Sequence, residues 1–178
     1  MAIRYGHRHS EDFDFFTFPF YRFNVGLLAE KLTNMPTEIV SISEGTLIFL
    51  MEGVKFSFFS YPYPLLEEPE FLEDLGVYLA KDRDILSMKA IAIAQRGSKK
   101  DFFDLWFLIN KNEVSISSIV EDLKHKYKNY NPGIFLKALT CFEDAEKEVN
   151  PQIDRFWEEI KEYITLLIRS EYNHNASP

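Results

Sequence analysis

The 178-residue sequence contains a single cysteine, Cys141, and no long hydrophobic run. One thiol cannot form an internal disulfide or supply a cysteine-cluster zinc site, which excludes a disulfide-stapled domain and a cysteine-based zinc finger. The longest strongly apolar stretches, residues 47–51 and 164–168, fall far short of the about 20 residues that a membrane-spanning helix needs. We therefore expect no membrane span.

The chain has fewer basic than acidic residues, 20 Lys and Arg compared with 28 Asp and Glu, which gives a net charge of −8. This balance excludes wholesale phosphate-backbone binding of the histone type and leaves room only for a local basic patch. Residues 1–8 carry charge and no apolar segment, which argues against a secretory signal and favours a cytoplasmic protein. Hydrophobic residues make up 46% of the chain, enough for the core of one domain with at most a helical appendage.

The first third of the chain has the pattern of strands with one helix between them. The dipeptides Glu44-Gly45 and Glu52-Gly53 favour tight hairpins, so the strands on either side of them should form an antiparallel meander. Strands are predicted over residues 12–18, 38–43, 46–51 and 54–61, and a helix over residues 23–35.

Beyond a Pro- and Glu-rich stretch at 61–74, which predicts a loop, and a short predicted strand at 75–79, the pattern becomes helical. Asp84 is the predicted N-cap of a helix that runs to Arg96 and stops at Gly97. Further helices are predicted over residues 99–110, 116–128, 132–147 and 151–169. We therefore predict an α+β fold with a small mixed or antiparallel sheet in residues 1–80, a helical part in residues 81–172 and a disordered tail at 173–178.

Two carboxylates, Asp12 and Asp14, share one face of the first predicted strand, because alternate residues of a strand point the same way. Such a pair could hold Mg²⁺, with substrate phosphates and water completing the shell, although an Asp-x-Asp pair is also common on a solvated strand face. Cationic donors lie just upstream, at Arg4, His7, Arg8 and His9. They would either contact a phosphate-bearing substrate or form a solvated N-terminal segment.

A second group of charges lies in the helical half. Lys89 and Arg96 are seven residues apart on one helix face, and the rest of that helix surface is nearly all Ala and Ile. Lys89 should therefore lie against the protein body and require an anion. Asp101 and Asp104 share a face of the following helix and could pair with these cations or lie near a metal ion. The alternative interpretation is a structural ion-pair network.

Two further features have ordinary structural interpretations. The aromatic series Phe15, Phe16, Phe18 and Phe20 is expected to belong to the core rather than to a base-stacking surface. The basic run at residues 124–128 is expected to be a solvated helix end, although it could contact RNA.

Residues 6–16, GHRHSEDFDFF, are followed downstream by Met88-Lys89 and by residues 96–105, RGSKKDFFDL. In order and spacing these segments resemble the AbiEii/AbiGii-type nucleotidyltransferase-like toxin family. Residues 136–146, leading to Trp157, are similar to the helical C-terminal part of one branch of that family. Its members are similar to DNA-polymerase-β-type nucleotidyltransferases, in which a small mixed sheet carries the metal-binding acids and a helical part follows.

The resemblance implies metal-dependent transfer of a nucleoside monophosphate from an NTP to an acceptor hydroxyl. It implies that Asp12 and Asp14 bind Mg²⁺ or Mn²⁺ and nucleotide, and that Lys89 contacts the nucleotide phosphates. Asp101 and Asp104 match the late acidic motif of the family, in which an acid is needed for activity. Additional substrate contacts are predicted for Ser10, Arg8, Arg96 and Lys100.

Some relatives are toxins of toxin–antitoxin or phage-defence pairs that transfer nucleotides to the acceptor end of tRNA, so tRNA and a cognate antitoxin are the implied partners. The sequence departs from the family pattern in two ways. A Gly-Gly-Thr or Gly-Ser helix start, expected ahead of the Asp-x-Asp pair, is not among the printed residues, and Ser57 stands where a third carboxylate is expected. The alternatives are a catalytically degenerate nucleotide- or partner-binding module of the same fold and a metal-dependent phosphatase or nuclease.

Overall fold

The computed structural model describes residues 1–175, which divide into two compact units. The sheet unit comprises residues 8–64 together with residue 2, and the helical unit comprises residues 1, 3–7 and 65 onward. The observed division falls at residues 64/65 rather than at the predicted residue 80. The reason is that residues 66–80 are tied to the helical part: the backbone N–H of Leu66 donates to Asp84, and Arg4 donates to the carbonyl of Ala80.

The sheet unit contains a four-stranded mixed sheet with the order β1-β4-β3-β2. Its elements are β1 (Asp12–Phe16), α2 (Val25–Leu32), β2 (Thr37–Ser43), β3 (Thr46–Met51) and β4 (Val54–Phe59). Strands β2, β3 and β4 form the predicted antiparallel meander, and β1 adds to β4 in parallel. Both predicted hairpin turns are confirmed, with Gly45 and Gly53 at the positive φ values that tight turns need.

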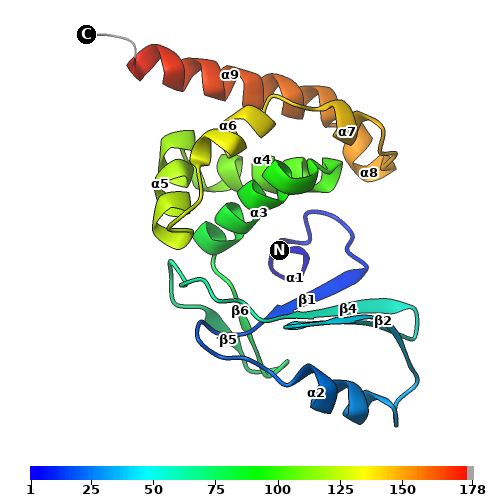
Figure 1. Ribbon diagram of the computed structural model, residues 1–178. Coiled ribbons are helices and arrows are strands. Elements are labelled where there is room, and N and C mark those ends of the chain that lie inside the picture. Colours follow the sequence, from blue (N-terminus) through cyan, green and yellow to red (C-terminus); the bar gives the residue numbers. More distant parts are fainter. Residues whose placement is uncertain (176–178) are drawn as a thin grey trace. The chain divides into compact units, whose positions relative to one another are not determined.

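Helix α2 covers one face of this sheet (Figure 1). Asn24 begins the helix by accepting a hydrogen bond from the backbone N–H of Leu27, so the helix is shorter than the predicted 23–35. Ala29 and Leu32 of α2 pack on Leu47 and Phe49 of β3, and these four side chains form the core of the unit. The opposite face of the sheet carries Asp12 and Asp14, which alternate with core-facing aromatic residues along β1.

The aromatic series after Asp14 is only partly core. Phe15 is half-buried and stacks on Phe58, but Phe16, Phe18 and Phe20 are exposed. The expectation of a buried series is therefore wrong for these three residues. Phe16 points to the face opposite Phe15, and Phe18 and Phe20 follow the end of the strand.

Strand β2 lies at one edge of the sheet, and its residues are mostly exposed. Its pairing with β3 shifts register between Ile39 and Ser41, so Val40 is an extra residue in the ladder, a β-bulge. Val40 and Ile42 are exposed apolar side chains on this edge strand.

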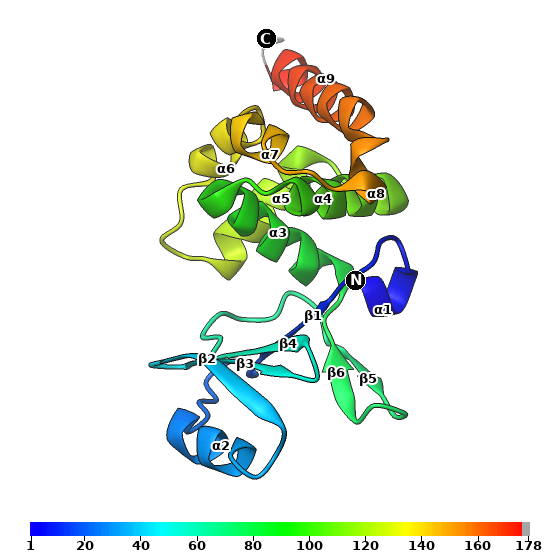
Figure 2. The same ribbon diagram turned by 90° about the vertical axis from the view of Figure 1, so that its right-hand side faces the viewer.

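The helical unit is built on α3 and α4, with later helices packed around them (Figures 1 and 2). Its elements are α1 (Ala2–Tyr5), β5 (Glu70–Leu72), β6 (Val77–Leu79), α3 (Asp82–Arg96), α4 (Lys99–Asn112), α5 (Ile116–Lys126), α6 (Pro132–Ala138), α7 (Glu143–Glu146), α8 (Pro151–Asp154) and α9 (Trp157–Asn175). Strands β5 and β6 form a separate antiparallel hairpin. Fully buried side chains from α3, α4, α6 and α9 share one core, including Ala90, Phe102, Phe135 and Ile160.

Within residues 1–175 no helix is long and apolar enough to cross a membrane.

Several predicted boundaries in this unit are wrong. The predicted loop at 61–74 contains β5, and α3 begins at Asp82 after the cap residue Lys81, so Asp84 is not an N-cap. The predicted helix at 132–147 is two helices, because the hydroxyl of Thr140 bonds to the carbonyl of Lys137 and the chain turns there. The predicted helix at 151–169 is likewise two, α8 and α9. Helix α9 continues to Asn175, so it includes the start of the predicted disordered tail, and residues 176–178 of that tail lie outside the described residues.

Candidate functional site

The sheet unit places Asp12 and Asp14 on one face of β1, as predicted. In the parallel register of β1 and β4, Asp12 lies opposite Lys55 and Asp14 lies opposite Ser57. The ammonium of Lys55 is 3.0 Å from a carboxylate oxygen of Asp12, and Asp14 is exposed. The side chains of Lys55 and Asp12 are both partly open to water, so their ion pair contributes little stability and can be exchanged for another cation.

Asp12 and Asp14 can supply two carboxylate ligands to a divalent ion such as Mg²⁺. Mg²⁺ in proteins commonly has one or two carboxylate ligands, with water and substrate phosphates in the other positions. Within the described chain, no group of three or more His, Cys, Asp or Glu side chains is arranged to hold a metal ion. Ser57, which is 2% exposed, occupies the position opposite Asp14 where a third carboxylate was expected. The donors present therefore suit an ion whose coordination a phosphate-bearing substrate completes.

The helical unit builds a charge cluster from α3 and α4. The ammonium of Lys89 on α3 lies 3.0 Å from Oδ1 of Asp101 and 2.7 Å from Oδ2 of Asp104, both on α4. Each carboxylate is essentially buried, whereas the side chain of Lys89 is 21% exposed. The prediction that Lys89 lies against the protein and pairs with these acids is confirmed.

Asp101 is the most highly connected member of the cluster. It accepts hydrogen bonds from Arg96 at 2.7 and 3.1 Å and from the hydroxyl of Ser98 at 2.9 Å, in addition to that from Lys89. Burial by itself would raise the pKa of this carboxyl, but the hydrogen bonds and charges of Arg96 and Lys89 outweigh burial and hold the pKa below its usual range. Asp101 is therefore held as a carboxylate.

His7 joins the cluster from the N-terminal segment. Its Nε2 lies 2.8 Å from Oδ1 of Asp104, and its ring packs against the rings of Phe103 and Phe107. Nδ1 of His7 is buried without a hydrogen-bond partner. Neither alternative that the sequence offers for His7, a contact to substrate or a solvated N-terminal residue, fits the structure, because the ring is buried against α4. Arg4 is also engaged within the protein, with Asp82, Glu70 and the carbonyl of Ala80.

The other predicted substrate residues differ in their surroundings. Ser10 is exposed, and Arg8 is half-buried and donates to the carbonyl of His9. The side chain of Arg96 is exposed while its guanidinium holds Asp101, and Lys100 is half-buried on α4. The structure thus brings Lys89, Arg96, Asp101 and Asp104 together in the helical unit, and Asp12 and Asp14 together in the sheet unit.

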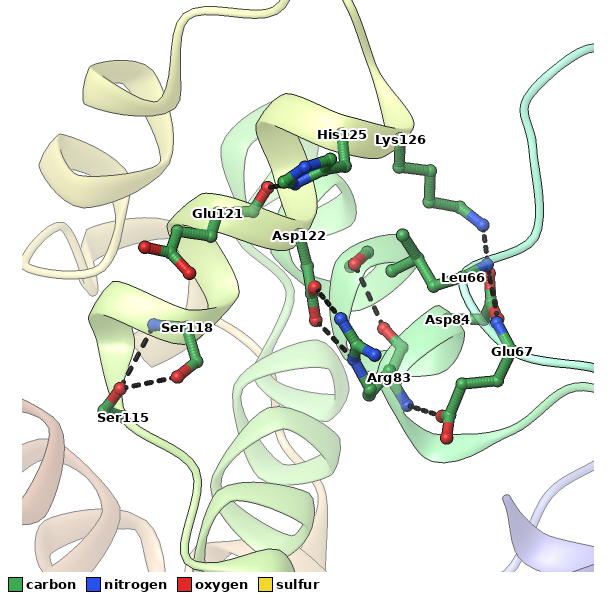
Figure 3. A network of polar contacts seen from close by, with 11 residues as sticks. Leu66, Glu67, Arg83, Asp84, Ser115, Ser118, Glu121, Asp122, His125 and Lys126 are labelled. Carbon is green, nitrogen blue, oxygen red and sulfur yellow. Dashed lines mark hydrogen bonds and ion pairs between the residues drawn. The ribbon is translucent and has the colours of Figure 1, made fainter.

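A further buried network lies outside the predicted site (Figure 3). Asp84 on α3 accepts the backbone N–H groups of Leu66 and Glu67 at 3.1 Å and forms an ion pair with Lys126 of α5. Both charged side chains are almost completely buried. The expectation that residues 124–128 form only a solvated helix end is therefore wrong for Lys126.

Periodicity could have identified Lys126 in advance. The buried positions of α5 include Ile116, Ile119 and Leu123, at the spacing of one helix face, and Lys126 continues this series. A neighbouring ion pair, between Arg83 of α3 and Asp122 of α5, also links these two helices. The side chain of Arg83 is about half exposed. These contacts fix α3, and therefore Lys89, relative to α5.

Each charge group has its own chemistry. A carboxylate pair can hold a divalent cation, and a fixed, partly exposed ammonium can neutralise phosphate charge. Phosphoryl transfer depends on such positioning and charge neutralisation more than on covalent chemistry by the protein.

Comparison with known proteins gives the family. The family described as "Nucleotidyl transferase AbiEii toxin, Type IV TA system" matches residues 51–170, more than half of the chain. The matched range includes Ser57 and the Lys89 cluster on α3 and α4, and it does not include β1. The uncharacterized protein aq_aa25 of Aquifex aeolicus (strain VF5) is 49% identical in an alignment 178 positions long. This alignment covers 98% of this chain and 85% of that protein. No solved structure matches. The chain belongs to the AbiEii nucleotidyl transferase toxin family, as its segments at Lys89 and residues 96–105 had indicated.

Proposed function

We propose that this chain is a nucleotidyltransferase that moves a nucleoside monophosphate from an NTP to an acceptor hydroxyl, with Mg²⁺ or Mn²⁺ as the cofactor. The acceptor oxygen bonds to the α-phosphorus, and the bond from that phosphorus to the β-phosphate oxygen breaks. Pyrophosphate leaves, and the hydroxyl proton passes to the solvent. The family supports the reaction class, and the charge groups on β1 and on α3 and α4 support the assignment of residues.

Asp12 and Asp14 would hold the divalent ion, which supplies positive charge at the phosphates. Lys89 binds phosphate oxygens through its ammonium, and Arg8 adds a second cation. Asp101 and Asp104 are positioning residues, since each fixes the Lys89 ammonium from a different side.

The observation that carries the proposal is the way in which Lys89 is held. Two buried carboxylates lie within 3.0 Å of one ammonium that is still partly exposed. Burying charges in this way costs free energy that an apolar core would not cost, and Lys89, unlike the fully buried Lys126, keeps part of its side chain open to water. The arrangement is well explained as the fixation of a cation that faces a ligand.

For the acceptor and the partners we propose the molecules that the resemblance implies. These are tRNA as the acceptor of the nucleotide and a cognate antitoxin as the protein that counteracts the toxin. Both fit a cytoplasmic location, where NTPs and tRNA are present.

The test is transfer of label from each α-phosphate-labelled NTP onto total tRNA or total protein, with Mg²⁺ or Mn²⁺. Asp14→Asn should abolish transfer while leaving the circular dichroism spectrum unchanged. Glu38→Gln, which removes an exposed acid from the edge strand β2, is the matched control and should transfer as the wild type does. Transfer by Asp14→Asn at the wild-type rate would contradict the proposal.

A second candidate function is a catalytically degenerate nucleotide-binding module, and Ser57 is the observation that favours it. Two carboxylates hold a metal ion less firmly than three, and the residue opposite Asp14 has no charge. This candidate predicts Asp14-dependent binding of Mn²⁺ and NTP without transfer of label by the wild type. Label on any acceptor that depends on Asp14 would exclude it.

A further inference from the structure

Aromatic rings gather where β1 and β4 end in the sheet unit. The ring of Phe16, which is 42% exposed, stacks on Phe59 with centroids 5.4 Å apart and meets Tyr61 edge-on at 5.2 Å. Tyr61 meets Tyr63 edge-on, also at 5.2 Å, and Tyr63 is 41% exposed. We refer to Phe16, Phe59, Tyr61 and Tyr63 as the aromatic cluster.

The backbone beneath the aromatic cluster is fixed by Thr17. Its N–H donates to the carbonyl of Phe59 at 2.9 Å, and its hydroxyl oxygen accepts the N–H of Tyr61 at 2.9 Å. These two bonds extend the pairing of β1 and β4 beyond the last strand residues. The exposed rings are therefore carried on a rigid support, which lowers the entropy that a ligand loses when it binds them.

The aromatic cluster lies on the same sheet face as the proposed metal-binding acids. Asp12, Asp14 and Phe16 alternate along β1 and so point the same way, whereas Phe13 and Phe15 stack on the opposite face. Two residues of a strand span about 7 Å, so Phe16 follows Asp14 by about that distance. A phosphate-bearing ligand at Asp14 would thus find aromatic rings directly beside it.

Phe20, four residues after Phe16 in the sequence, combines an unusual backbone conformation with an almost fully exposed ring. Residues 18–21 form a turn closed by the N–H of Tyr21 and the carbonyl of Phe18, with Pro19 and Phe20 at its centre. Phe20 has φ of 70°, at the turn position that normally takes glycine. Its side chain is 95% exposed, so packing does not compensate for this strain. The fold gains nothing from an aromatic ring at this position.

We propose that the aromatic cluster and Phe20 bind a nucleobase by stacking. The inference rests on the proposed function, since the acids on the same face locate the phosphates of the ligand. Stacking on aromatic side chains is how proteins hold unpaired bases without reading their sequence. A stable protein partner would instead bury at least about 1,000 Å² in total, more than a few rings provide. The base belongs either to the NTP or to an unpaired end of a nucleic-acid acceptor.

The experiment measures equilibrium binding to the full chain with three probes: ATP with Mg²⁺, labelled hexaadenylate and a labelled abasic hexamer. The variants are Phe16→Leu and Tyr63→Leu, which keep an apolar side chain and remove the ring. Matched controls are Phe71→Leu and Tyr78→Leu, because these residues form an exposed aromatic pair on the β5–β6 hairpin of the helical unit. We expect each cluster variant to bind ATP or hexaadenylate about 5- to 100-fold more weakly, and the controls to bind as the wild type does.

The two base-containing probes distinguish the sources of the base. A loss confined to ATP assigns the stacked base to the NTP, and a loss confined to hexaadenylate assigns it to the acceptor. Wild-type affinity of both cluster variants for both probes would overturn the proposal. Equal binding of the abasic hexamer and hexaadenylate, with ATP binding unaffected by the variants, would also overturn it.

Phe20→Gly separates ligand binding from a structural role. Glycine relieves the strain at positive φ, so the melting temperature should stay the same or rise while nucleobase affinity falls. A lower melting temperature with unchanged affinity would show that Phe20 has only a structural role. Because binding is measured without turnover, failure of the stacking proposal is distinguishable from failure of label transfer.

Discussion

His7 and Lys89 bind the two oxygens of one carboxylate, Asp104. Nε2 of His7 lies 2.8 Å from Oδ1, and the ammonium of Lys89 lies 2.7 Å from Oδ2. The side chains of His7 and Asp104 are each only 1% exposed. His7 therefore fixes the carboxylate that in turn fixes Lys89, although it is more than 80 residues away from both in sequence.

Replacement of His7 should show this connection. His7→Phe fills the space between Phe103 and Phe107 but removes a donor from buried Asp104, so we expect about 1–3 kcal/mol lower stability in urea unfolding. His7→Gln retains a side-chain N–H and should lose less. A His7→Phe variant that unfolds at the wild-type urea midpoint would show that the contact contributes nothing.

Lys89→Met should be both inactive and unstable. It removes the ammonium that the buried carboxylates of Asp101 and Asp104 share, and we expect a loss of about 3–5 kcal/mol. Adding Asp104→Asn removes one of the two negative charges, so the double variant should regain much of this stability without regaining label transfer. Restored transfer in the double variant would contradict the assigned role of Lys89.

Asp101 predicts an acid-sensitive fold. Its pKa is lowered in the folded protein from an unfolded value of about 3.8, because Arg96 and Lys89 outweigh burial. A carboxyl with a lowered pKa contributes stability above its unfolded pKa and loses that contribution as the pH falls through the folded pKa. The unfolding free energy of the wild type should therefore fall more steeply below about pH 4 than that of Asp101→Asn. Parallel curves for the two proteins in that range would contradict this prediction.

The buried pair of Asp84 and Lys126 can be tested in the same way. Lys126→Met leaves Asp84 as a buried charge and should lower stability by about 3–5 kcal/mol. Adding Asp84→Asn removes that charge while an oxygen remains to accept the N–H groups of Leu66 and Glu67, so the double variant should be more stable than Lys126→Met alone. Additive losses in a double-mutant cycle would show that the pair is not coupled.

Lys55→Met tests the divalent-ion site without touching its acids. Lys55 lies 3.0 Å from Asp12 and competes for the same carboxylate as a metal ion would. The variant should bind Mn²⁺ a few-fold more tightly, measured by calorimetry or by the paramagnetic resonance of free Mn²⁺. Conversely, Asp12→Asn should weaken binding. Identical Mn²⁺ affinity in all three proteins would place the ion elsewhere.

Local pattern predicted much of this structure and failed where distant residues meet. Strand β3 has the predicted bounds, both hairpin turns are correct, and α3 ends at Arg96 with Gly97 as its cap, because alternation and turn residues act over a few positions. The pairing of Lys89 was also predictable, since a lone cation on an Ala and Ile surface needs a nearby anion. In contrast, the partners of His7 and Lys126 lie 97 and 42 residues away. Helical periodicity marks Lys126 as a buried position but does not name its partner, and nothing local distinguishes His7 from a solvated side chain.

The bulge at Val40 affects how copies of the chain meet one another. An edge strand with exposed Val40 and Ile42 and no lysine is a template for intermolecular β-pairing and aggregation. An extra residue in the ladder bends the strand and increases its twist, so a straight strand from another molecule cannot match its hydrogen-bonding groups along the full length. This irregularity disfavours extension of the sheet by a second copy of the chain.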